Sequence, residues 1–142
     1  MAIHTATLSF ETQGSTQMID ITPEVARVVR DSELDAGIVT VFCPGSTGGI
    51  TTIEYEGGAI SDFQRLFGEI APENKHYAHN ARWGDGNGHS HISAALLGPS
   101  LTVPFADRAL LTGTWQQIIF VDFDNRGRSR RVVVQVMGEK DS

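Results

Sequence analysis

The sequence predicts a β-rich α+β fold, an antiparallel β-sandwich with two or three helices packed on one side. Most apolar segments are short and rich in β-branched residues, and only a few show helical spacing. Regular strand–helix–strand alternation, which would indicate a parallel sheet, is not seen. With 142 residues and 40% hydrophobic content, the chain is long enough for one core. We therefore expect a single domain over residues 1–142.

The first third of the chain predicts two strands and a helix. Residues 2–11 alternate between apolar and polar, which indicates a half-buried strand, and residues 18–21 form its return strand. Thr22 followed by Pro23 is typical of an N-cap and the first helical position. This helix is expected to end near Ser32.

The middle of the chain predicts two further strands and two helices. Residues 37–43 form a β-branched run that is typical of a buried strand, and residues 50–55 follow as the next one. Apolar residues at helical spacing predict a helix over 59–71. A short helix is expected over 92–97, ended by Gly98.

Three strand candidates close the chain, over residues 101–105, 115–123 and 131–137. Residues 124–127 are polar and contain a glycine, so they predict a hairpin between the last two strands. The strand count is then about seven, joined mainly by hairpin-like connections.

Charge and cysteine content exclude several classes of protein. A net charge of −6 disfavours nucleic-acid binding, and a basic cluster near the C-terminus is interpreted as a solvated strand end. The single Cys43 excludes an intrachain disulfide and is compatible with a reducing cytoplasm. No signal peptide or span of ~20 apolar residues is seen. We expect a cytoplasmic protein without a membrane partner. The basic cluster comprises Arg126, Arg128, Arg130 and Arg131.

The segment from His79 to His91 concentrates polar chemistry, because it holds three of the five histidines. On an extended backbone His89 and His91 would point the same way, and His79 could supply a third ligand to a divalent metal, zinc first. Asp85 and Asn87 could orient the imidazoles. The alternative interpretation is a set of surface or structural histidines.

Two neighbouring segments supply further candidates. The Gly/Ser/Thr-rich residues 44–52 can cradle a phosphate, with Ser46 and Thr47 as contacts, or form a plain turn between strands. Glu54 and Glu56 share one face if the strand continues through them. A paired acid/base role is then possible, although a solvated edge suits Glu56 equally well.

Residues 113–118 read GTWQQI and place a large aromatic ring beside an amide. On a strand, Trp115 and Gln116 would face opposite sides. One of them is then expected to pack, while the other points to a cavity or an interface.

Several of these segments together resemble the YjbQ-like family, whose members carry the name secondary thiamine-phosphate synthase. The resemblance spans most of the chain. Its most specific element is the GTWQQI segment with SLTVP upstream. The matching segments are Gly45–Glu54, Asp85-x-Asn87 with His91, Leu97–Ser100, Ser100–Pro104, Gly113–Ile118 and Arg130–Val133.

The resemblance implies a β-rich sandwich with helices on one side, and a homotrimer with clefts between its subunits. In such a ring each interface is heterologous and closes by rotation. It also implies a site of catalytic type. The residues that match the family's candidate site are Glu54, His79, Asp85, Asn87, His91 and Gln116.

This chain departs from the family pattern at three positions. Many relatives have a histidine where this chain has Gly45, and His89 could compensate for it. Arg108 replaces a glycine and could place a cation near the pocket mouth, and Phe105 replaces a branched aliphatic residue.

Three functions stay open at this point. The first is an enzyme that joins a pyrimidine pyrophosphate to a thiazole phosphate and releases pyrophosphate, which needs charge neutralisation in a closed site. The second is metal-assisted hydrolysis of a small phosphorylated or acyl metabolite. The third is a trimeric protein that binds a small ligand or a metal without turnover.

Overall fold

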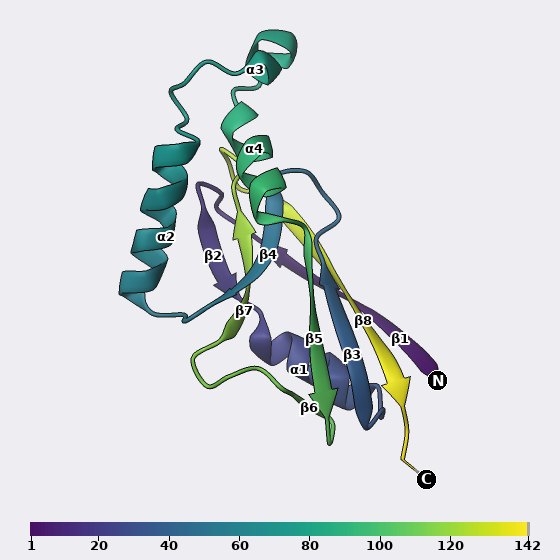
Figure 1. Ribbon diagram of the computed structural model, residues 1–142. Helices are drawn as coiled ribbons and strands as arrows, with labels where there is room; N and C mark the ends of the chain where they lie inside the picture. The colour runs from purple at the N-terminus through teal and green to yellow at the C-terminus, as the bar shows by residue number, and fades with distance from the viewer. Residues whose placement is uncertain (142) are drawn as a thin grey trace.

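A computed structural model describes residues 1–141, which form eight strands and four helices (Figure 1). In chain order these are β1 (Ala2–Glu11), β2 (Gln17–Asp20), α1 (Thr22–Asp31), β3 (Ala36–Phe42), β4 (Gly48–Ile53), α2 (Gly57–Ile70), α3 (Ala78–Trp83), α4 (Gly88–Leu97), β5 (Ser100–Ala106), β6 (Ala109–Leu110), β7 (Gln117–Asp122) and β8 (Ser129–Glu139).

The strands form two antiparallel sheets. The larger sheet has the order β1-β8-β3-β5-β6 and the smaller has the order β2-β7-β4. In the larger sheet, Val39 of β3 lies opposite Val136 of β8 and Val103 of β5. This register puts the inward-facing valines of three strands on one face. The β-rich α+β sandwich that the sequence predicts is therefore the observed fold.

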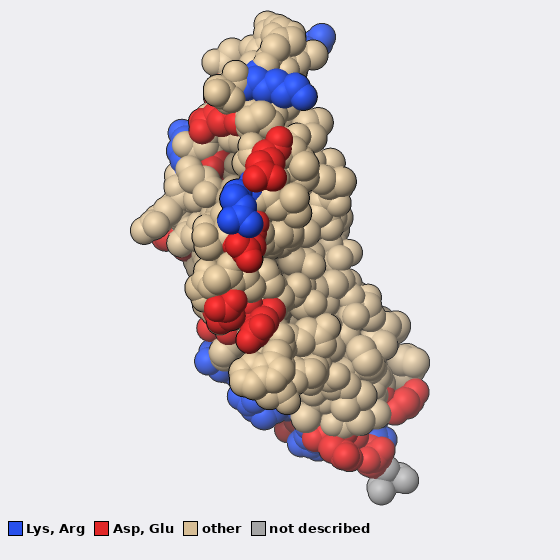
Figure 2. Space-filling view, turned by 60° about the vertical axis from the view of Figure 1, so that its left-hand side comes forward, with Lys and Arg blue, Asp and Glu red and all other residues tan. Residues whose placement is uncertain are grey.

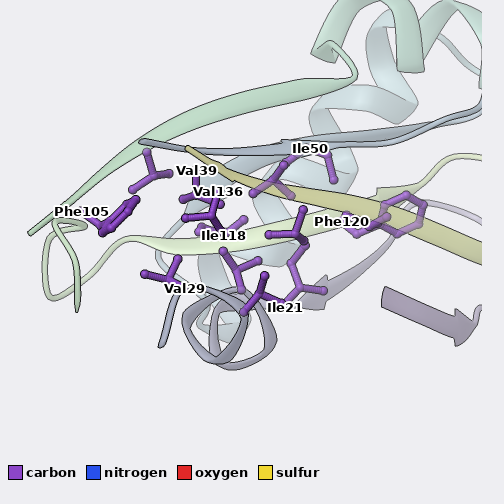
Figure 3. Close-up of a cluster of buried hydrophobic side chains, with 14 of the residues drawn as sticks. Ile21, Val29, Val39, Ile50, Phe105, Ile118, Phe120 and Val136 are labelled. Carbon is purple, nitrogen blue, oxygen red and sulfur yellow. The ribbon is translucent and has the colours of Figure 1, made fainter. Parts of the chain in front are cut away.

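The inner faces of the two sheets enclose the main core (Figure 3). Ile118 and Phe120 of β7 point from the smaller sheet into this core, and the valines of β3 and β8 point from the larger one. Helix α1 contributes Val25 and Val29, each fully buried. Valines at helical spacing predict this contact, because one stripe of α1 can bury only against a neighbouring layer.

The outer face of the smaller sheet is covered by α2 and α4. Ile119, Val121 and Phe123 alternate with the inward residues and meet Phe67 of α2 and Ala94 of α4. Strand β7 is therefore buried on both faces, which explains its continuous apolar run. Two helices pack on this one side as predicted, whereas α1 lies at the other end of the molecule in Figure 1.

Several predicted boundaries are wrong, for identifiable reasons. Helix α4 begins at Gly88 rather than Ile92, and α3 falls where a loop was expected. Ile21, not Thr22, occupies the N-cap position of α1. The Thr22 hydroxyl instead accepts a hydrogen bond of 2.7 Å from the backbone N–H of Ile118. This hydrogen bond joins residues 96 positions apart in the sequence, and it overrides the local preference of Thr22 for the N-cap position.

Two connections also differ from prediction. Residues 124–127 do not close a hairpin, because β7 and β8 belong to different sheets. Strand β4 ends at Ile53, so Glu54 and Glu56 do not share a strand face. Glu56 instead caps α2, where its carboxylate accepts hydrogen bonds from the backbone N–H groups of Gly58 and Ala59.

None of the helices within residues 1–141 is long and apolar enough to cross a membrane. On the face shown in Figure 2, acidic and basic side chains are scattered among uncharged ones, without a broad basic area.

Candidate functional site

Two of the predicted histidines lie against each other at one end of the molecule. The rings of His79 on α3 and His91 on α4 have centroids 4.3 Å apart and an interplanar angle of 37°. Gly84 ends α3 in the left-handed region at φ 73°, which lets the chain reverse within a few residues. This tight turn from α3 into α4 brings the two imidazoles together.

Asp85 and Asn87 support this pair from the turn between the helices. The Nδ1 atom of His79 lies 3.4 Å from Oδ1 of Asp85, but it is buried and makes no hydrogen bond within residues 1–141. Asn87 is buried, and in its favoured amide orientation its Nδ2 donates to the same Oδ1 at 2.9 Å. The reverse orientation directs that amide group toward Asp124, 3.4 Å away. Asn87 thus lies between Asp85 and Asp124, and its amide can donate to one or the other.

A buried ion-pair network lies beside the histidines, where β7 ends and β8 begins. Arg130 donates to both oxygens of Asp122, through Nε at 2.8 Å and Nη2 at 2.9 Å. Nη2 also donates to the Thr47 hydroxyl at 2.8 Å, and that hydroxyl donates to Asp124 at 3.0 Å. Arg128 donates to Asp124 through Nε at 2.9 Å. Thr47 is thus fully engaged within the protein.

The surroundings shift the pKa values of His91, Asp124 and Arg130, the last upward through its hydrogen bonds to Asp122. Burial lowers the pKa of His91, and the neighbouring His79 lowers it further, against smaller opposite effects of Asp124 and Asp85. Burial alone would raise the pKa of Asp124, but hydrogen bonds from Asn125, Thr47 and other donors bring it below its ordinary value. The site therefore favours a neutral His91 beside an ionised Asp124.

A cavity of about 440 Å³ lies between His91 and the ion-pair network. Its volume is in the range of small-molecule sites. Residues from the β3–β4 connection, α4 and the β7–β8 connection surround it: Gly45, Ser46, Thr47, Asn87, His91, Asp124, Arg128, Ser129 and Arg130.

His89 lies away from this cavity. Residues two apart on an α-helix point about 200° apart, so the extended backbone assumed for the H-x-H pair is the wrong premise. His89 lines a different cavity with Phe67 and Phe123, and its buried Nδ1 has no hydrogen-bond partner among the described residues. Residues 1–141 contain no group of three His, Cys, Asp or Glu side chains placed to hold a metal. Within one chain, His79, His89 and His91 therefore do not form a three-histidine site.

Glu54 and Gln116 lie at the opposite end of the smaller sheet. Gly48 pairs with Asp122 at one end, and Ile53 pairs with Gln117 at the other. Asp122 is six positions along the chain from Gln116, which corresponds to about 20 Å of extended strand. Gln116 lines a separate groove and donates to the Thr52 hydroxyl at 3.3 Å. Of the predicted site residues, the structure therefore brings together Ser46, Thr47, His79, Asp85, Asn87 and His91.

Sequence reasoning missed the four charged residues of the network. The arginines near the C-terminus were interpreted as a solvated strand end, but the Arg130 side chain is only 12% exposed and Asp122 is fully buried. The available signal was the matched spacing of Asp122-x-Asp124 and Arg128-x-Arg130 around a short turn.

Comparison with known proteins agrees with this fold. The family described as UPF0047 protein YjbQ-like matches residues 6–139. A UPF0047 protein of Methanothermobacter thermautotrophicus is 37% identical over 139 residues, covering 98% of this chain and 95% of the relative. The UPF0047 protein YugU of Bacillus subtilis is 33% identical, with 93% and 98% covered.

Solved structures lead to the same family. A YbjQ-like protein of unknown function from Sulfolobus solfataricus superposes with a TM-score of 0.88 at 28% identity, covering 97% of this chain and all of the other. A YjbQ/UPF0047 protein from Clostridium acetobutylicum gives 0.85 at 34% identity, with 93% and 99% covered. The chain belongs to the YjbQ/UPF0047 family.

Proposed function

We propose that this protein is an enzyme that transforms a small phosphorylated metabolite in the cavity beside His91. The observation that carries this proposal is that His91, whose ring packs against that of His79, lines a cavity that also contains two arginines. A neutral imidazole with a neighbouring imidazole can accept a proton and return it. Asp85 lies next to His79, and it would orient that imidazole if substrate binding brought the two side chains into hydrogen-bond contact, which they do not make in this structure.

The thiamine-phosphate synthase reaction is the first candidate, because the family resemblance implies it. In that reaction a ring nitrogen of a thiazole phosphate bonds to the methylene carbon of a pyrimidine pyrophosphate. The bond from that carbon to oxygen breaks, and pyrophosphate leaves with the electron pair. Such chemistry needs positioning and neutralisation of the leaving-group charge. The guanidinium groups and the N–H groups of the histidines could supply that neutralisation.

We also propose a homotrimer in the cytoplasm. Strand β4 is an edge of the smaller sheet, and β5 pairs with β6 only over Phe105 and Ala106, so both strands face one groove, which Gln116 and Leu111 also line. Trp115 beside it is 73% exposed, and large exposed apolar groups mark interaction sites. A partner subunit on this face would bury Trp115 and cover the end of the sheet that holds Glu54. Light scattering on the wild type and on Trp115→Ser tests this, and a monomeric wild type would refute it.

Activity of a purified histidine variant tests the proposed function. Wild-type protein is given the two synthase substrates, and released pyrophosphate and thiamine phosphate are both measured. His91→Asn is expected to lower the rate by about 10²–10⁴-fold, the usual contribution of a general acid or base. His89→Asn is the matched control, because it changes the same helix on its other face.

Negligible product from the wild type refutes the synthase assignment. A panel of phosphorylated metabolites is then screened by melting temperature, and each stabilising compound is analysed after incubation. A compound that is hydrolysed indicates the hydrolase alternative. A compound that stabilises the protein but is recovered unchanged indicates a binding protein instead.

A further inference from the structure

Both aspartates at the end of β7 have their hydrogen-bonding capacity taken up inside the protein. Asp122 accepts from the Thr12 hydroxyl at 2.6 Å and from the backbone N–H of Asp124 at 2.9 Å, besides Arg130. Asp124 accepts from the backbone N–H of Asn125 at 2.8 Å, besides Thr47 and Arg128. The carboxylates therefore hold the arginines in place and offer little to a ligand.

The unused groups around the cavity are mainly donors. Arg130 engages Nε and Nη2, whereas its Nη1 makes no hydrogen bond within residues 1–141. Arg128 engages only Nε over the same residues, so both of its terminal nitrogens are available. Ser46 lines the same cavity and has an exposed side chain.

Gly45 keeps the approach to Arg130 open. A Cβ atom at this position would lie 3.6 Å from Nη1 of Arg130. A larger side chain would therefore reach over the one free nitrogen of a guanidinium that is otherwise enclosed by its partners. The glycine does not have positive φ, so no backbone strain requires it here.

We propose that Arg130 Nη1, the terminal nitrogens of Arg128 and the Ser46 hydroxyl form a subsite for the terminal phosphoryl group of the substrate, with Gly45 leaving room for it. This inference rests on the proposed function and deepens it. Several donors around one cavity suit the several oxygens of a phosphoryl group, and guanidinium groups bind such oxygens in a fixed geometry. The phosphoryl group would sit at the network, with the rest of the substrate extending toward His91.

The subsite is preorganised rather than strongly charged. Two arginines and two aspartates sum to no net charge, so attraction at long range is weak. Binding then depends on directed hydrogen bonds from donors that are already held in place. We therefore expect inorganic phosphate alone to bind in the millimolar range, and a carboxylate such as acetate to bind more weakly.

Titration with inorganic phosphate, followed by isothermal calorimetry at low salt, tests the subsite. Gly45→Asp puts a carboxylate beside Nη1 and is expected to weaken phosphate binding about tenfold or more. Gly45→Asn is the matched control of similar shape, and is expected to weaken binding less. Arg128→Gln should also weaken binding, whereas Arg126→Gln in the exposed part of the same turn should not.

Three results would overturn the proposal: no phosphate binding by the wild type at tens of millimolar, equal binding by wild type and Gly45→Asp, or acetate binding as tightly as phosphate. Each variant's melting temperature shows whether it is folded. Because no turnover is measured, the outcome is independent of the His91→Asn assay. Loss of activity in His91→Asn together with unaltered phosphate binding in Gly45→Asp would uphold the enzyme and refute this subsite.

Discussion

The rings of His79 and His91 lie 4.3 Å apart although the two residues belong to different helices. Two protonated imidazoles at this distance would repel each other. Since burial also disfavours a charged His91, its pKa is lowered. His91 is therefore held neutral more readily than a free imidazole, and a neutral imidazole is the form that can accept a proton.

The lowered pKa of His91 predicts a loss of stability in acid. The ordinary pKa of histidine is 6.5, and the pKa of His91 in the folded chain is lower. In the pH range between these two pKa values, the unfolded chain binds more protons than the folded chain. The contribution of His91 to the free energy of unfolding is complete above pH 6.5, and it is lost as the pH falls through the pKa of His91 in the folded chain. Melting temperatures measured from about pH 8 to about pH 5 should fall less steeply in His91→Gln. An unchanged slope would contradict this origin.

A direct titration separates the two causes of this shift. The ring protons of His91, followed by NMR, should titrate with a midpoint below 6.5. His79→Asn removes the charge repulsion, so the midpoint should move upward, while the effect of burial remains. A midpoint that stays in place would show that His79 has no influence.

The Asp122–Arg130 pair predicts a large stability loss when one partner is removed. Arg130→Met leaves the fully buried Asp122 with only Thr12 and a backbone N–H as partners. Breaking such a pair costs about 3–5 kcal/mol. Urea unfolding should show this loss in Arg130→Met, whereas the exposed Arg131→Met should change stability little. The double variant Asp122→Asn/Arg130→Met should recover part of the loss, because no uncompensated charge remains.

Local patterns were sufficient where an element is decided by its own periodicity. The alternation over β1 and the valine stripe of α1 each predicted the correct element and the correct buried face. The short segment that holds Asp85, Asn87 and His91 likewise brings these residues close together at the turn into α4. These features depend on residues close in the chain, which is why the sequence shows them.

Long-range contacts account for what the sequence did not predict. Arg130 is buried because Asp122, on a strand of the other sheet, faces it, and the matched spacing of aspartates and arginines did not by itself show that the two strands would enclose the pair. The H-x-H pair depended on the assumption of an extended backbone, and α4 begins early enough to separate His89 from His91. Glu54 follows the far end of β4, away from the cavity that His91 lines.

The close contact between α3 and α4 predicts that Gly88→Ala disrupts the histidine pair. A Cβ atom at Gly88 would lie 2.5 Å from Cβ of Tyr77 and 3.0 Å from Oδ1 of Asn80. Helix α3 must then move away from α4, taking His79 with it. Such overpacking costs about 1–3 kcal/mol. Gly68→Ala, in open space on α2, should stabilise the protein by about 0.5–1 kcal/mol instead. Urea unfolding measures both changes, and equal stability of the two variants would contradict the contact.

Zinc binding, which the histidine-rich segment suggests, predicts a different dependence on each histidine. Because His89 faces another cavity, it cannot coordinate a zinc ion that lies beside His91. Protein loaded with zinc and dialysed is measured by elemental mass spectrometry. His89→Ala should keep the wild-type zinc content, whereas His91→Ala should lose it. Loss in His89→Ala alone would place the metal on the far side of α4, and a wild type without zinc would leave His79 and His91 with proton transfer as their role.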